Sequence, residues 1–155
     1  MSPHRNISIV WDFDGTLTPE DSTSKIIEHF LGKGNEHQFW KWIKKVNGSL
    51  STKNWERMLS SDAPTWMYVL SRIAFGKKVP LSEQFFSKKE VTNLISLYPG
   101  VGTTLRKIKD FEKDKRFKYC KIKVHHFIVT AGLQEYVKEL APKQIFSNIW
   151  GGRYS

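Results

Sequence analysis

The chain has 155 residues, of which 39% are apolar, and an excess of lysine and arginine gives it a formal net charge of +10 at pH 7. This length and apolar content suffice for one core, so we expect one domain with an insert. The single cysteine excludes an internal disulfide and a zinc site built on paired cysteines. No apolar run approaches the roughly 20 residues of a membrane span, and the amino-terminus lacks a signal-peptide pattern, so we expect a soluble, cytoplasmic protein without a membrane partner.

The first predicted element is a buried strand, formed by the β-branched run 7–10. It leads into Trp-Asp-Phe-Asp-Gly-Thr at 11–16, which places Asp12 and Asp14 where the strand ends. In a parallel α/β sheet, ligands bind at this end of the strands. Two close carboxylates repel each other unless a cation separates them or one holds a proton, so the pair indicates a divalent metal or acid–base chemistry. Helix capping would explain one acid but not both.

The segment 20–98 shows helical spacing of apolar residues and no alternating strand pattern. Ser22 or Thr23 is the expected cap of the first helix, and Asn35 that of the second. The first predicted helix runs from its cap through Leu31, and the second carries Phe39, Trp40, Ile43 and Val46 and stops at Gly48. The others are a short helix with Trp55, Met58 and Leu59, one from Asp62 to Gly76 and one over about 82–97. We therefore predict an all-helical insert after the first strand.

After Pro99-Gly100 the pattern predicts a helix over 103–111, a strand over 124–129, a helix over 133–140 and a third strand over 144–150. The second strand ends in Thr130, Ala131 and Gly132. A hydroxyl group and free backbone N–H groups at the start of a helix can hold phosphate oxygens. The same three residues could instead serve only as a helix cap.

These motifs resemble the haloacid dehalogenase (HAD) superfamily, whose phosphatases carry Asp-x-Asp-x-Thr after the first strand and an apolar strand ending in Ser or Thr further on. The resemblance implies an α/β fold with a HAD-like (Rossmannoid) parallel sheet. It assigns 1–19 and 99–155 to the core and 20–98 to a helical cap that closes over the active site. The likeness covers nearly the whole chain, which matches the amino-terminal two-thirds of a typical HAD protein.

The resemblance also implies a Mg²⁺-dependent hydrolysis of a small phosphorylated substrate through an aspartyl-phosphate. Asp12 would be the nucleophile, and Asp14 the general acid and base. Asp12 and the backbone carbonyl of Asp14 would hold Mg²⁺. The phosphate would lie against Gly15 and Thr16 in the first motif and Thr130, Ala131 and Gly132 in the second.

The family's catalytic lysine and paired-acid loop follow further strands and have no counterpart after Trp150. We therefore expect impaired hydrolysis, and the alternative is a non-catalytic remnant that binds phosphate or serves as an interaction module. The family's sheet also predicts that the first strand becomes an apolar edge, which favours self-association, aggregation or low stability. Lys138 and Lys143 precede the third strand and are interpreted as surface charges.

The positive charge is concentrated in 88–123, which holds eleven basic and four acidic residues. Such a stretch can attract nucleic acid or phosphorylated ligands. We favour a solvated helix face and loop, so nucleic-acid binding is the weakest of the three functional hypotheses. His125 and His126 lie within the second strand with no acid or cysteine nearby in sequence, which argues against a metal role.

Overall fold

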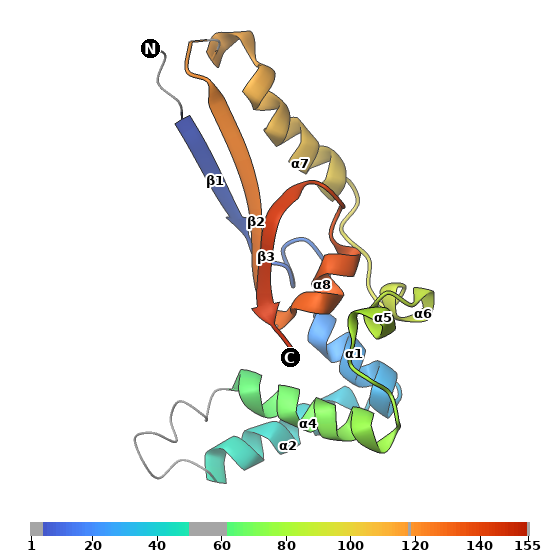
Figure 1. Cartoon of the computed structure of the whole chain (residues 1–155). Coiled ribbons are helices and arrows are strands. Elements are labelled where there is room, and N and C mark those ends of the chain that lie inside the picture. Colours follow the sequence, from blue (N-terminus) through green and yellow to red (C-terminus); the bar gives the residue numbers. More distant parts are fainter. Residues whose placement is uncertain (1–4, 50–61, 118, 155) are drawn as a thin grey trace.

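Three parallel strands and the helices around them make up this computed structural model, which describes residues 5–49, 62–117 and 119–154. The strands are β1 (Arg5–Trp11), β2 (Ile122–Leu133) and β3 (Phe146–Gly152). The strand order is β1-β2-β3, so β2 is central and β1 lies at an edge (Figure 1). The protein is therefore an α/β protein with a small open parallel sheet, and the predicted edge position of the first strand is confirmed.

Helices are the regular elements that the structure describes between β1 and Pro99. They are α1 (Ser22–Leu31), α2 (Glu36–Ser49), α4 (Asp62–Gly76), α5 (Glu83–Phe86) and α6 (Lys89–Thr92). Figure 1 shows α1, α2 and α4 beyond the carboxyl ends of the strands, on the side to which the β3 arrow points. The predicted short helix with Trp55, Met58 and Leu59 lies outside the described residues.

Two predictions within this helical segment are wrong. Asp21, rather than Ser22 or Thr23, caps α1, and its side chain accepts a hydrogen bond from the backbone of Ser24. The single helix expected over 82–97 is two short helices, because the backbone is extended at Lys88 (ψ 136°). This turn allows Phe85, Phe86 and Val91 all to be buried, which one continuous helix would not allow at that spacing.

The remaining helices cover one face of the sheet. They are α7 (Val101–Lys109), the 3₁₀ turns η1 (Asp110–Lys113) and η2 (Lys115–Phe117), and α8 (Gln134–Leu140). Both α7 and α8 lie on the same side of the strands in Figure 1. Val124, His126 and Ile128 of β2 are buried beneath them, whereas Val129 points the other way and is 50% exposed. In the part of the chain that the structure describes, no helix is both long and apolar enough to cross a membrane.

Apolar side chains form two clusters. One lies between the sheet and the helices that cover it, and the other lies in the helical layer, which consists of α1, α2, α4, α5 and α6. The cluster under the sheet contains Phe13 and Leu17 from the loop after β1, Ile128, Ile149 and Val137. The second cluster joins the helices beyond the strands, with close aromatic pairs such as Phe30 and Phe85. Leu133 and Tyr136 belong to the second cluster although they come from β2 and α8, so the helical layer packs directly on the carboxyl end of the sheet.

Candidate functional site

Asp12 and Asp14 lie in a tight loop at the carboxyl end of β1. The backbone N–H groups of Thr16, Leu17 and Thr18 all donate to the Phe13 carbonyl, which folds the loop around that oxygen. Gly15 adopts a positive φ of 75°, a conformation that glycine accepts without steric cost. Asp12 is exposed, and its Oδ1 accepts a hydrogen bond from the Phe13 N–H at 2.8 Å.

Asp14 is half-buried and joins the loop to the start of α1. Its Oδ1 accepts a hydrogen bond from the Ser22 N–H at 2.8 Å, and its Oδ2 accepts one from the Ser22 hydroxyl at 3.1 Å. Burial raises the pKa of the Asp14 carboxyl, and the negative charges of Asp21 and Asp12 raise it further, although the two hydrogen bonds from Ser22 act against the shift. Asp14 therefore holds a proton at higher pH than an ordinary aspartate.

Thr130 and Gly132 lie at the carboxyl end of β2, immediately before α8, whose N-cap residue is Leu133. β2 continues through Leu133, and its pairing with β3 is irregular between Val129 and Leu133. The Gly132 N–H donates to Thr130 Oγ1 at 2.9 Å, so this amide is not free to hold phosphate. Such an irregularity is typical of a β-bulge, and β-bulges often redirect side chains next to binding sites. The Thr130 hydroxyl keeps its own proton for donation.

Gly132 is the point where the two motifs meet. A Cβ atom at this position would lie 2.8 Å from the Ser22 hydroxyl, 3.2 Å from Thr130 Oγ1 and 3.4 Å from Asp14 Oδ2. Oxygen atoms from the loop after β1, from α1 and from β2 therefore converge here. The sequence predicted the proximity of Asp14 and Thr130 but not the part of Ser22, which appeared only as a possible helix cap.

The other predicted phosphate ligands are less closely grouped. Thr16 is exposed and lines a cavity of about 200 Å³ with Pro99, Gly100 and Thr104, and none of the residues lining that cavity comes from β2. Ala131 is exposed on the opposite face of β2 from its buried neighbours, because side chains alternate along a strand. Gly15 contributes the turn that places Asp12 and Asp14.

The donor set for a divalent cation is small. The described residues contain no group of three or more His, Cys, Asp or Glu side chains that could hold a metal ion. Asp12 offers its Oδ2, whereas both carboxylate oxygens of Asp14 accept hydrogen bonds from Ser22. One carboxylate and one backbone carbonyl fit Mg²⁺ that keeps several waters and takes its other ligands from a phosphate, which is how Mg²⁺ is usually held with phosphorylated substrates.

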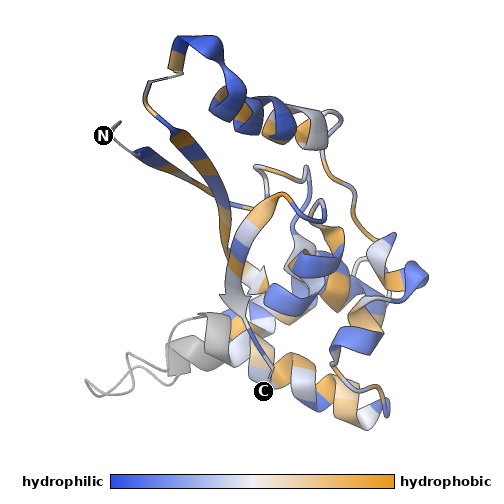
Figure 2. Ribbon diagram, turned by 45° about the horizontal axis from the view of Figure 1, so that its top comes forward, coloured by the Kyte–Doolittle hydropathy of each residue, from blue (hydrophilic) through white to orange (hydrophobic). Residues whose placement is uncertain are grey.

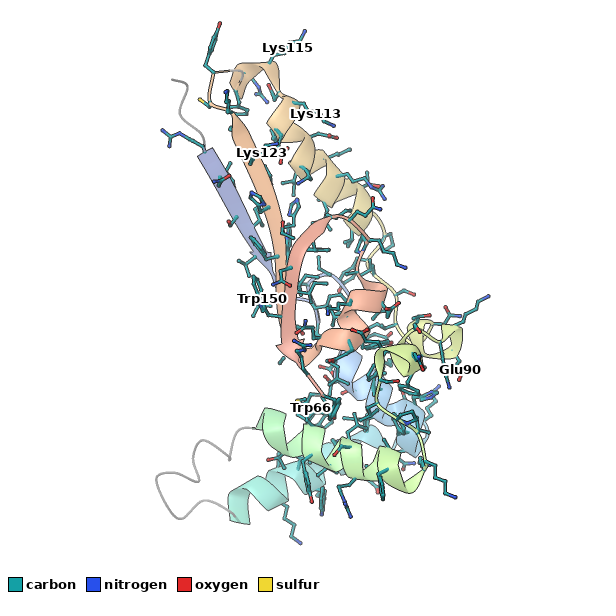
Figure 3. The ribbon with its side chains drawn as sticks, in the orientation of Figure 1. Trp66, Glu90, Lys113, Lys115, Lys123 and Trp150 are labelled. Atoms are coloured by element: carbon teal, nitrogen blue, oxygen red, sulfur yellow. The ribbon has the colours of Figure 1, made fainter. Side chains whose placement is uncertain are left out.

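Lys143 and the lysines around η1 lie away from Asp12 and Asp14. Lys143 is in the turn before β3, at the amino end of that strand, where it lines a cavity with Arg106 and Lys109. Lys113, Lys115 and Lys123 lie at the far end of the molecule from the helical layer (Figure 3). The charges that act most on the Asp14 carboxyl are those of Asp21 and Asp12, which are negative.

Comparison with known proteins adds no relative: no family model, curated protein or solved structure matches this chain.

Proposed function

We propose that this chain is a HAD-type phosphomonoester hydrolase that depends on Mg²⁺ and forms an aspartyl-phosphate. The observation that carries the proposal is the pairing of an exposed Asp12 with a half-buried Asp14 of raised pKa at the carboxyl end of β1. The Thr130 hydroxyl lies at the carboxyl end of the neighbouring strand, where it accepts a hydrogen bond from the Gly132 N–H and can donate its own proton to a phosphate oxygen.

In the first step, an Asp12 carboxylate oxygen attacks the phosphorus atom and the bond from phosphorus to the alcohol oxygen breaks. Asp14 gives its proton to the departing oxygen. In the second step, Asp14 takes a proton from water, whose oxygen attacks the phosphorus and releases inorganic phosphate and free Asp12. The Thr130 hydroxyl donates to a phosphate oxygen. Mg²⁺, bound by Asp12 and the Asp14 carbonyl, would offset negative charge on the phosphoryl oxygens.

We expect turnover to be slow. The charges nearest to Asp14 are acidic, and Lys143, which precedes β3, cannot supply a cation at the carboxyl ends of the strands. Loss of one group that stabilises the charge of the transition state commonly raises the activation free energy by about 3 kcal/mol, which slows the reaction about a hundredfold. Because Ser22 also occupies both Asp14 oxygens, phosphate binding without turnover is the second candidate function.

The test is hydrolysis of p-nitrophenyl phosphate by the purified chain, with and without Mg²⁺. We expect Asp12→Asn to abolish the Mg²⁺-dependent rate, because it removes the nucleophile and a metal ligand while keeping the shape of the side chain. Asp110→Asn, on the exposed turn η1, is the matched control and should keep the full rate.

A hydroxylamine-sensitive phosphoenzyme that forms in the wild type and not in Asp12→Asn would support the hydrolase. Activity that survives in Asp12→Asn would overturn it. Phosphate-dependent protection of the wild type against thermal unfolding, with no Mg²⁺-dependent turnover, would favour the binding module instead.

A further inference from the structure

A basic surface covers the end of the molecule that lies away from Asp12 and Asp14. We call it the basic tip and define it by eight side chains from α7, η1, η2, the turn before β2 and the start of β2. They are Arg106, Lys107, Lys109, Lys113, Lys115, Arg116, Lys121 and Lys123. Figure 3 labels three of them at this end of the sheet, and Figure 2 shows that much of α7 and the turns after it is hydrophilic.

Only some of the cations of the basic tip form ion pairs. The acidic side chains of the stretch are Asp110, Glu112 and Asp114, so the tip has a formal net charge of +5. Lys113 pairs with Asp110 at 2.8 Å, Arg116 pairs with Asp114 at 2.7 Å, and Glu112 lies 3.5 Å from Lys109 and 3.8 Å from Lys123.

Four cations of the tip therefore form no ion pair within the described residues: Arg106, Lys107, Lys115 and Lys121. All four are exposed. Exposed cations whose charge no carboxylate neutralises are the groups that a polyanion can pair with, because each contact releases a counterion from a phosphate.

A hollow lies at the base of the tip. It has a volume of about 350 Å³ and is lined from one side by Arg106, Lys109 and η1, and from the other by the loop before β3 with Lys143. This volume is within the range of small-ligand pockets. Two acids, Asp110 and Glu112, also line the hollow, but they pair with lysines of the tip. Arg106 and Lys143 are both exposed and form no ion pair in the part of the chain that is described, so the hollow leaves two unpaired cations for a phosphate group.

Aromatic rings are exposed on the same surface. Phe111 of η1 is 46% exposed, and Tyr119, in the turn before β2, is 74% exposed. The Phe117 ring lies under the Arg116 guanidinium at 5.7 Å. Exposed rings among cations are typical of surfaces on which unpaired bases stack while the phosphates are neutralised.

From these observations we propose that the basic tip binds single-stranded nucleic acid. The phosphates pair with the four free cations and with Lys143, and the bases stack on Phe111 and Tyr119. An acidic peptide would use the cations but would leave the rings unexplained, and a duplex would have no unstacked bases to offer them. The surface lies at the amino end of β2, so this activity is independent of the hydrolase at the carboxyl ends of the strands.

The test is fluorescence anisotropy of a labelled 12-residue oligouridine with the whole 155-residue chain, from 50 to 300 mM salt. We expect binding in the micromolar range at 50 mM salt and a slope of log K against log salt of about −3, for about four phosphates neutralised. Lys107→Gln, Lys115→Gln and Lys121→Gln together should bring the slope close to −1 and weaken binding at least tenfold. Phe111→Ala with Tyr119→Ala should weaken binding and leave the slope unchanged.

The matched control removes three exposed lysines from other surfaces: Lys33→Gln, Lys77→Gln and Lys138→Gln. It should keep both the affinity and the slope, and circular dichroism compares the folding of all variants. The proposal is overturned if the wild type does not bind at 50 μM protein and 50 mM salt, or if the control loses as much affinity as the tip variant. Equal competition by polyglutamate would assign the surface to an acidic protein, and preferential binding to phosphatidylserine vesicles would assign it to a membrane.

Discussion

The Asp14 carboxyl is half-buried between the loop after β1 and the start of α1. Burial raises its pKa, and the hydrogen bonds that Ser22 donates to both of its oxygens act against this shift and hold the group in one orientation. Asp12, two positions earlier, is exposed and hydrogen-bonded only by the Phe13 N–H among the described residues. The two side chains are chemically identical but differently placed, and the proposed hydrolase uses the exposed one as nucleophile and the half-buried one as acid.

The Asp14→Asn variant tests this division of roles. The amide keeps an acceptor for the Ser22 N–H but can neither protonate the leaving oxygen nor activate water. With p-nitrophenyl phosphate, whose leaving group needs no proton, we expect a burst of nitrophenolate that matches the enzyme concentration, followed by a steady state about 10² to 10⁴ times slower than in the wild type. With an alkyl phosphate the burst should be absent. A burst of equal size with both substrates would contradict the role of Asp14 as acid.

His126 makes the stability of the protein depend on pH. It is fully buried, and its Nδ1 accepts a hydrogen bond from Trp11 Nε1 at 3.0 Å. Burial lowers the pKa of the His126 imidazole, and Lys109 lowers it further, while the nearby Leu105 carbonyl acts in the opposite direction. The unfolded chain therefore takes up a proton here at a higher pH than the folded one, so stability is lost as the pH falls below about 6.5, the ordinary pKa of histidine.

We expect the melting temperature of the wild type to fall between pH 7.5 and pH 5 more steeply than that of His126→Asn, in which an amide oxygen can replace Nδ1 as the acceptor. His125→Asn, at the neighbouring position on the other face of β2, is the control and should retain the wild-type slope. Differential scanning calorimetry at half-unit pH steps measures the three curves. Parallel curves for the wild type and His126→Asn would contradict the prediction.

At the scale of elements, β3 packs closely against the bulged end of β2. A Cβ atom at Gly151 would lie 2.8 Å from the Gly132 carbonyl oxygen and 3.0 Å from Thr130 Cγ2. The first of these neighbours is backbone, so it cannot turn aside as a flexible side chain could. The glycine is required by this close approach, because no residue with a Cβ fits without moving one strand away from the other.

We therefore expect Gly151→Ala to destabilise the fold by about 1 to 3 kcal/mol, the usual cost of overpacking. Gly102→Ala is the matched control: its Cβ would meet only the end of the Arg106 side chain, at 3.8 Å, within α7. It should be neutral or stabilising by up to about 1 kcal/mol, since alanine favours helix more than glycine does. Urea unfolding of both variants measures the difference, and equal stabilities would show that the strands can separate at no cost.

The sequence predicted those elements whose signals are local. The β-branched run before Asp12 and the spacing of apolar residues over 62–76 each define an element without reference to the rest of the chain, and both lie where expected. The division of 82–97 into two helices depends on burying Phe85, Phe86 and Val91 together, which is a tertiary requirement. The continuation of β2 through Gly132 likewise depends on its pairing with β3.

The candidate site shows the same limit. Asp12, Asp14 and Thr130 could be named from the two motifs, because parallel strands bring their carboxyl ends together. Ser22 could not be named as a partner of Asp14, since a serine at a helix start usually indicates only a cap. Its role follows from the position of α1 against the loop after β1, which no local pattern specifies.

The helices within the described residues cover only one face of the sheet. Val10, Val129 and Trp150 are 61%, 50% and 46% exposed on the other face, where the Trp150 ring stacks on Phe127 at 5.4 Å. Figure 3 shows Trp150 on β3 on this side. β1 adds an edge whose outer backbone groups pair with no other strand in the described ranges. An apolar face that ends in an unpaired strand is a surface prone to association.

We predict that the chain self-associates through the β1 edge, and that Val10→Lys reduces this association. Val10 is a better position than Ile9, because Ile9 is half-buried next to His126 on the covered face, and a lysine there would also disrupt packing. A lysine on an edge strand opposes strand pairing between copies.

Sedimentation velocity from 5 to 200 μM measures the association of the wild type, Val10→Lys and Val129→Lys. The last variant places the same charge on the open face of the central strand. Loss of association in Val10→Lys alone indicates pairing at the edge. Equal loss in both variants would mean that the open faces stack, and a wild type that stays monomeric at 200 μM would contradict self-association by either route.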